Sequence, residues 1–246
     1  LILLRLRLPN DEPQFAARGQ AIAYSGGSDA SPEADGDYDP GNETDGEPKK
    51  LSWFDPRLRA WVLAGLIGGH AQAMIMGIVG FLVLDRMGMR SNPEEGATLV
   101  SLVFMFGALA TLLAQWGLIP RFRLGPRVAT LSGMTTAALG TAILGLASDI
   151  YSLSLGFAIA SLGFGLFRPG STAGSSLSVT RAEQGQASGV VASVAGASFI
   201  YAPAVGVWLY NTNAPIAFGL IAALCLAVTV VGWRGLALDS DLTRDR

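Results

Sequence analysis

Two ionisable side chains stand inside long uncharged stretches of this sequence and could carry chemistry there. His70, the only histidine, lies in the middle of one stretch, and Arg168 closes another. An ionisable group within a membrane-spanning helix marks a functional site by default, and an imidazole could exchange a proton near neutral pH. The competing interpretations are a neutral His70 ring that joins two helices, and an Arg168 side chain that reaches the membrane surface as an anchor.

Aromatic and polar residues recur at helical spacing around these positions. On a helix, residues three and four apart share a face. Arg168 therefore shares a face with three residues that precede it: Phe157, Ser161 and Phe164. Gln115 shares a face with three others: Phe104, Ala108 and Thr111. The Gln115 face could line a pathway or hold helices together. Met74 and Met76 fit packing better than a soft-metal site.

The elements that must position these side chains are six runs without Asp, Glu, Lys or Arg. They cover residues 60–84, 97–119, 128–148, 150–167, 184–210 and 214–233, and each has 18 to 27 residues. About 20 helical residues cross the hydrocarbon core of a bilayer. Only helices or closed barrels satisfy the backbone there, and the runs lack the alternation of strands. We predict an all-α membrane protein with a bundle of six transmembrane helices over residues 56–235, embedded in a lipid bilayer.

The remaining segments are polar or short. Half of the residues are hydrophobic and 15% are charged, whereas soluble domains carry about a quarter charged residues. Residues 9–55 hold 11 of the 19 acidic residues, ten of them between Asp11 and Glu47, and are rich in Gly, Ser and Pro, so we predict a disordered acidic linker. Within it, the spacing of Asp35, Asp37 and Asp39 is that of a calcium loop, but Pro40 breaks the pattern. We interpret residues 1–8 as the end of a truncated transmembrane helix and residues 236–246 as a tail.

The distribution of Lys and Arg predicts the orientation. Alternating the loops places most basic residues on the side of the linker, and only Arg86 and Arg90 on the other side. Cytoplasmic loops are enriched in Lys and Arg. We therefore predict that four segments are cytoplasmic, in a plasma or inner membrane: the linker, the basic turn at 120–127, the polar connector at 169–184 and the tail.

Cys225 is the only cysteine, so one chain cannot form a disulfide.

Small residues at intervals of four predict where helices pack closely. The candidates are Gly65, Gly69 and Gly77 in the first run and Gly185 and Gly189 in the fifth. Pro203, in the outer part of the fifth run, is predicted to kink its helix.

Two segments resemble major facilitator transporters, especially the drug–proton antiporter branch. Residues 115–127, Gln-Trp-Gly-Leu-Ile-Pro-Arg-Phe-Arg-Leu-Gly-Pro-Arg, resemble the Gly-rich basic loop between helices eight and nine. Residues 163–170, the stretch Glu-Gln-Gly-Gln-Ala-Ser-Gly at 183–189, and Pro203 resemble helix ten, its connector and helix eleven. Pro120 stands where the family loop often carries an Asp. The resemblance covers residues 57–235 and numbers the six helices seven to twelve.

The resemblance implies a secondary transporter that moves a small organic molecule by alternating access, with proton-coupled efflux as the expected direction. The partner would be an N-terminal six-helix half of the same transporter. Expected cavity residues are His70, Met74, Phe157, Ser161, Phe164, Arg168 and Tyr201. The loop implies a conformational role for Gly117, Arg121, Arg123, Gly125 and Arg127. Because the six runs hold no acidic residue, a carboxylate that carries protons would lie in the other half.

Other functions remain open at the level of sequence. The chain could be a stand-alone six-helix scaffold or a channel subunit. An intramembrane serine protease would need a serine such as Ser175 or Ser176 near His70, but the order of Ser and His in the chain is opposite to the pattern of such proteases. We expect no enzyme, no cofactor, no metal site and no nucleic-acid partner.

Overall fold

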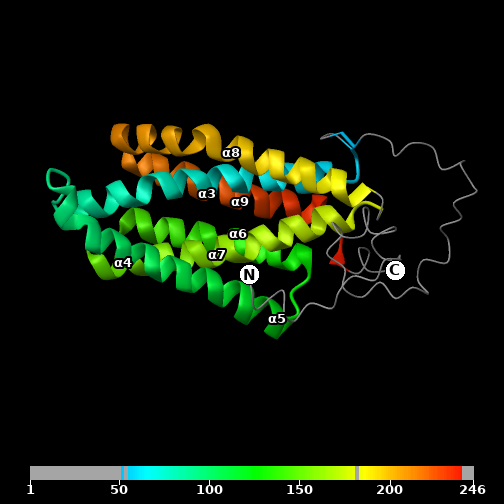
Figure 1. Ribbon diagram of the computed structural model, residues 1–246, viewed down its shortest axis with the longest axis horizontal. Helices are drawn as coiled ribbons and strands as arrows, with labels where there is room; N and C mark the ends of the chain where they lie inside the picture. The colour runs from blue at the N-terminus through cyan, green and yellow to red at the C-terminus, as the bar shows by residue number, and fades with distance from the viewer. Residues whose placement is uncertain (1–50, 53–54, 181–182, 240–246) are drawn as a thin grey trace, which may run out of the picture.

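The computed structural model describes residues 51–52, 55–180 and 183–239 (Figure 1). The predicted helix end at 1–8, the calcium-like acidic spacing and the linker up to residue 50 lie outside the described residues. The same holds for the tail from residue 240 onward.

The described chain forms six long helices that run along one common direction (Figure 1). They are α3 Arg59–Arg86, α4 Pro93–Leu112, α6 Pro126–Leu146, α7 Ile150–Leu177, α8 Gln184–Thr212 and α9 Ala214–Gly235. α4 continues without interruption through a π-helical segment η2, Leu113–Leu118, and a short helix α5, Ile119–Phe122. All six spans are long and apolar enough to cross a membrane, and no strand occurs among the described residues. The predicted all-α architecture with six transmembrane helices is confirmed.

α7 is longer than the sequence predicts. The predicted connector at 169–184 begins as helix, because α7 passes through Pro169 and ends at Leu177. Proline removes one backbone hydrogen bond, which membrane helices tolerate when neighbouring groups compensate. The polar residues that suggested a loop bond to their own helix instead: the Ser175 hydroxyl donates to the Ser171 carbonyl at 2.9 Å, and Ser178 donates to Gly174 at 2.7 Å. Arg168 therefore lies inside a helix and does not end one.

The closest helix pair is α6 with α7, which are joined by a tight turn. Asp149 caps α7, since its carboxylate accepts hydrogen bonds from the backbone N–H groups of Tyr151 and Ser152 at 2.9 and 3.0 Å. Glycines let the two backbones approach. A Cβ atom at Gly140 would lie 2.2 Å from the Ala160 nitrogen, and one at Gly163 would lie 2.4 Å from the Ala137 nitrogen. Sequence analysis did not single out these glycines.

α3 packs along α8 on its other side. A Cβ atom at Gly69 would lie 2.8 Å from the Ser198 hydroxyl oxygen, and one at Gly77 would lie 2.8 Å from the Pro203 carbonyl oxygen. Gly65 has ordinary contacts with α7 and α8. Gly185 and Gly189, which we expected to pack against a neighbouring helix, instead have no atom of another described helix within 4 Å. α8 presents Ala187, Val190 and Val194 to the bundle and turns Gly185 and Gly189 outward.

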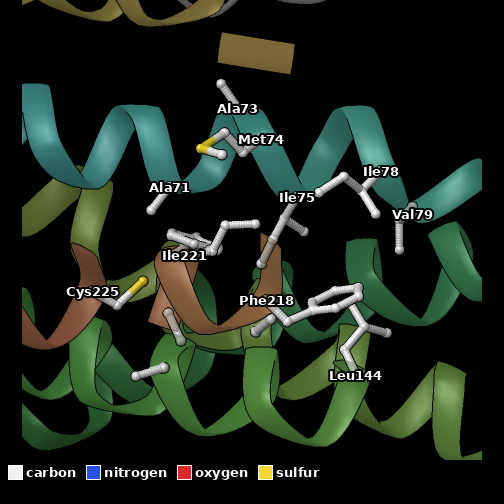
Figure 2. Packing of buried hydrophobic residues seen from close by; sticks show 14 of the residues in the cluster. Ala71, Ala73, Met74, Ile75, Ile78, Val79, Leu144, Phe218, Ile221 and Cys225 are labelled. Atoms are coloured by element: carbon white, nitrogen blue, oxygen red, sulfur yellow. The ribbon is translucent and has the colours of Figure 1, made fainter. Parts of the chain in front are cut away.

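The main core lies where α9 packs between α3 and α6. Ile75 of α3 points toward Ile221 and Phe218 of α9, and Leu144 of α6 lies beside Phe218 (Figure 2). Cys225 belongs to the same cluster and is fully buried. A thiol reagent can therefore reach Cys225 only when the bundle opens.

The last residues of the predicted linker are held against the start of α8. The Leu51 backbone N–H donates to the Gln186 side-chain oxygen at 2.8 Å. Arg57 forms two hydrogen bonds of 2.9 Å with the Glu183 carboxylate and an ion pair with Asp55. These bonds from Arg57, with further ones from the backbone and hydroxyl of Thr180, lower the pKa of Glu183 to about 2. The arrangement ties the chain before α3 to the loop between α7 and α8.

Replacing Glu183 by glutamine is expected to destabilise this end of the bundle by about 0.5–1 kcal/mol, since Arg57 is partly exposed and solvent screens the pair. A carboxyl group whose pKa is lowered on folding stabilises the protein above its unfolded pKa, and this contribution is lost as pH falls toward the folded value. The difference in unfolding temperature between wild type and Glu183→Gln should be full at pH 7, shrink below about pH 4.5 and vanish near pH 2. A difference that does not change with pH would contradict this.

Candidate functional site

A hollow of about 270 Å³ lies between α3, α4 and α7. Its size is close to the lower end for small-molecule pockets, which is roughly 300 Å³. Its wall combines three aromatic rings with polar groups: Phe104, Phe157, Phe164, Gln72, Gln115, Thr111, Ser161 and Arg168. The four residues that sequence analysis placed on one face of α7 all border this hollow. The face predicted around Gln115 borders it as well.

Glycine and threonine on α4 shape the wall opposite α7. A Cβ atom at Gly107 would lie 2.3 Å from the Phe157 ring, so only glycine lets α7 approach α4 here. Phe157 in turn meets Phe104 edge to face, with 5.4 Å between ring centroids. The Thr111 hydroxyl lies 3.0 Å from the Gly107 carbonyl and 3.3 Å from the Ser161 carbonyl. These contacts fix the aromatic part of the hollow.

The π-helical segment η2 places Gln115 in the wall. A π-helical turn holds one residue more than an α-helical turn, and such turns occur often at functional sites. Gln115 lies within η2, is exposed, and makes no hydrogen bond to a residue that the structure describes. Sequence analysis missed η2, because nothing in the residue types from Leu113 to Leu118 separates a π-helix from an α-helix.

Arg168 lies at the border of the hollow and also lines a second one of about 60 Å³ between α3, α7 and α8. With a rise of 1.5 Å per residue, it is about 7 Å from the midpoint of the 28-residue α7. The hydrocarbon core extends about 15 Å to each side of its centre. Arg168 is exposed there, so a cavity residue and an anchor whose side chain reaches the membrane surface both fit its place in α7.

The Arg168 guanidinium makes few contacts with other described residues. It lies 6.0 Å from the centroid of the Phe199 ring of α8. Neither a hydrogen bond nor an ion pair links it to any residue in the described part of the chain. The five N–H donors of the guanidinium are therefore available to a ligand or to water.

His70 does not line either hollow. It lies between α3 and α8, where its Nδ1 is 2.7 Å from the Leu66 carbonyl and 3.1 Å from the Ser198 hydroxyl. Its Nε2 contacts the Tyr201 hydroxyl. A carbonyl can only accept, so Nδ1 carries a hydrogen, and in the neutral ring the Tyr201 hydroxyl donates to Nε2. Tyr201 is about half exposed, so its hydroxyl group links the imidazole to the surface of the bundle.

Besides His70, two residues predicted for the cavity, Met74 and Tyr201, do not line the hollow. Ser198, which contacts His70, was not predicted. Met74 is buried against α8, where its backbone faces Gly206, and belongs to the same core cluster as Ile75 (Figure 2). Tyr201 faces His70, away from the hollow. The spacing of three between Ser198 and Tyr201 places both on one face of α8.

The serines considered for proteolysis do not meet His70. Ser175 is buried and donates to its own helix. Ser198 contacts His70 but is fully buried and borders neither hollow. A nucleophile must meet its substrate, so this pair has no access. Within residues 51–52, 55–180 and 183–239, no group of three or more His, Cys, Asp or Glu side chains could hold a metal ion.

The residues of the basic loop lie at one end of the bundle, outside the hollow. Gly117 is in η2 and Arg121 in α5, and the turn is made by Arg123 with φ of 48°. A Cβ atom at Gly125 would lie 2.3 Å from the Asp239 carboxyl carbon.

The Asp239 carboxylate accepts the Arg127 backbone N–H at 2.8 Å, and the Arg127 guanidinium lies over the Trp233 ring. These contacts join the start of α6 to the end of α9.

Fold and site together define a multi-pass membrane protein whose described residues form six apolar helices, with a polar, partly aromatic hollow between three of them. Compared with known proteins, the chain matches no family model and no curated protein.

Proposed function

We propose that this chain is a six-helix half of a secondary transporter of the major facilitator type, which moves a small organic molecule by alternating access. The observation that carries the proposal is the hollow between α3, α4 and α7. It combines aromatic rings, two amides and a cationic group within a bundle that otherwise packs apolar residues. Apolar pockets with a few polar groups are typical of small-molecule sites.

The pairing of the helices supports the same proposal. α3 packs mainly on α8 and α4 mainly on α7, whereas α6 packs first on α7 and then on α9 (Figure 1). If α3, α4 and α6 formed one repeat and α7, α8 and α9 a second, a two-fold axis would exchange the α3–α8 pair with the α4–α7 pair. The same axis would map the α6–α9 pair onto itself. Inverted repeats of three helices are the building units of each half in major facilitator transporters. The motif resemblance at residues 115–127 and 183–189 points in the same direction.

In this proposal His70 exchanges the coupling proton. It is the only histidine, and its ring bridges α3 and α8 through Leu66, Ser198 and Tyr201. In the neutral ring Nε2 accepts a hydrogen bond from the Tyr201 hydroxyl. Once Nε2 carries a proton, it donates to that hydroxyl instead. Such a change at a helix interface could bias one arrangement of the helices over another. The linker and the tail face the cytoplasm, the membrane is the plasma or inner membrane, and an N-terminal half completes the transporter.

A substitution that fills the hollow tests transport directly. Ala108→Phe places a ring among the wall residues and is expected to lower substrate flux by at least about 10-fold, because the ring occupies space that the substrate needs in the hollow. Leu109→Phe adds a ring at the next, lipid-exposed position of the same helix and serves as the matched control.

The measurement uses proteoliposomes of the full-length protein and a panel of labelled organic molecules, with and without a pH gradient. Equal flux in Ala108→Phe and Leu109→Phe would contradict a route through the hollow. Flux that ignores the pH gradient would remove the proton-coupled part of the proposal. If the chain were a stand-alone scaffold, no substrate flux would be measured that Ala108→Phe lowers.

A further inference from the structure

We infer that the hollow selects a small organic anion with an aromatic or otherwise apolar body. The inference rests on the proposed transport function and names the substrate class of the same site. Its basis is the set of charges and donors that face the hollow, in which Arg168 is the only ionised side chain.

The Arg168 guanidinium is exposed at the border of the hollow and has no partner of opposite charge among the described residues. Intramembrane charged residues pair with one another, bind backbone carbonyls or face a water-filled cavity. Arg168 has the Phe199 ring at 6.0 Å and no hydrogen-bonding group of the described chain. Its planar fork of donors fits a carboxylate, sulfonate or phosphate in two parallel hydrogen bonds. The guanidinium donors are open toward the hollow, where the anionic group of a ligand can bind them.

The rest of the wall fits an apolar body next to that anionic group. Phe157 and Phe164 lie about three turns and one turn before Arg168 along α7, and Phe104 faces Phe157 from α4. Aromatic rings favour stacked or edge-to-face neighbours. The amide of Gln115 has no partner among the described residues and can donate to or accept from a polar substituent.

The same wall disfavours organic cations. None of its residues is acidic. In the part of the chain that the structure describes, Asp and Glu side chains occur only at helix ends and in loops, as Asp85, Glu94 and Glu183 do. A cation in the hollow would meet Arg168 without a compensating carboxylate, and like charges in a medium of low dielectric constant repel strongly.

Three probes with one naphthalene body test the inference: 2-naphthoate, 2-naphthalenemethanol and 2-naphthylmethylammonium. Binding to the protein in phosphatidylcholine nanodiscs is measured by titration, and empty nanodiscs give the background. We expect naphthoate to bind about 10- to 100-fold more tightly than the alcohol, because a charge-assisted hydrogen bond has this strength. The ammonium probe should bind most weakly.

Variants identify the residue responsible. Arg168→Gln should abolish the preference for naphthoate, whereas Arg168→Lys should keep part of it. Arg121→Gln removes an exposed charge outside the hollow and should leave the preference unchanged. Protection of Cys225 from maleimide verifies that each variant is folded.

The inference is overturned if the alcohol or the ammonium probe binds most tightly, if naphthoate shows no saturable binding, or if Arg168→Gln keeps the preference. Its failure differs from failure of the proposed function. Flux of a neutral or cationic molecule that Ala108→Phe blocks would leave transport standing without the anion preference. Naphthoate that binds through Arg168 but is never moved would leave the anion site standing without transport.

Discussion

Replacing Gly140 by alanine is expected to lower the unfolding temperature of the protein by about 5–10 °C. The added Cβ would lie 2.2 Å from the Ala160 nitrogen and 2.6 Å from its Cα. Both are backbone atoms, so no rotamer change can relieve the contact and the two helices must separate. Overpacking costs about 1–3 kcal/mol or more. In soluble proteins of 150–250 residues, each kcal/mol shifts the unfolding temperature by about 2–4 °C.

The only cysteine provides the measurement. Cys225 is fully buried, so a maleimide dye that fluoresces on reaction reports unfolding of the detergent-solubilised protein during heating. Gly189→Ala is the matched control, because the same methyl group there meets no neighbour within 4 Å. The control should be unchanged or slightly more stable, since alanine favours helix over glycine. Equal unfolding temperatures for the two variants would refute the close approach of α6 and α7.

Replacing His70 by glutamine is expected to reduce flux driven by a pH gradient by at least about 100-fold. Glutamine can still donate to the Leu66 carbonyl, which lies 2.7 Å from Nδ1 of the imidazole. It cannot take up a proton at neutral pH, so the contact with Tyr201 no longer changes with protonation. The expectation follows from the proposed role of His70 as the proton-exchanging group.

Counterflow separates loss of coupling from loss of transport. Exchange of labelled for unlabelled substrate needs no net proton movement, so His70→Gln should retain it. Tyr201→Phe keeps the ring beside His70, 5.1 Å between centroids, but removes the hydroxyl, and we expect an intermediate loss of gradient-driven flux. Normal gradient-driven flux in His70→Gln would show that another group carries the proton.

The six spans could be predicted because the membrane imposes a simple rule on composition. A helix in lipid must be apolar over about 20 residues, and each run without charges corresponds to one observed helix. The end of α7 could not be predicted in this way. Pro169, Gly170 and Ser171 have the composition of a loop, and only their contacts with other helices and their own carbonyls keep them helical.

The candidate site was predictable along one helix but not between helices. The spacing of Phe157, Ser161, Phe164 and Arg168 places them on one face of α7, and the structure brings that face to the hollow. For α3 and α8 the rotation about the helix axis was not readable, because these helices are apolar on all sides and their pattern marks no inner face. The pattern therefore did not show that His70 meets Ser198 and Tyr201 of α8, and it predicted a contact that Gly189 does not make.

The order of the helices along the chain has a consequence for biogenesis. α6 and α7 follow one another through the turn at Asp149, so this hairpin can pack as soon as both helices have entered the membrane. α3 meets α8 through residues such as Leu66 and Ser198, which are 132 positions apart, so that interface closes only late in synthesis. A defect at Gly140 would thus be visible to quality control before the ribosome has finished, and one at Gly77 only afterwards.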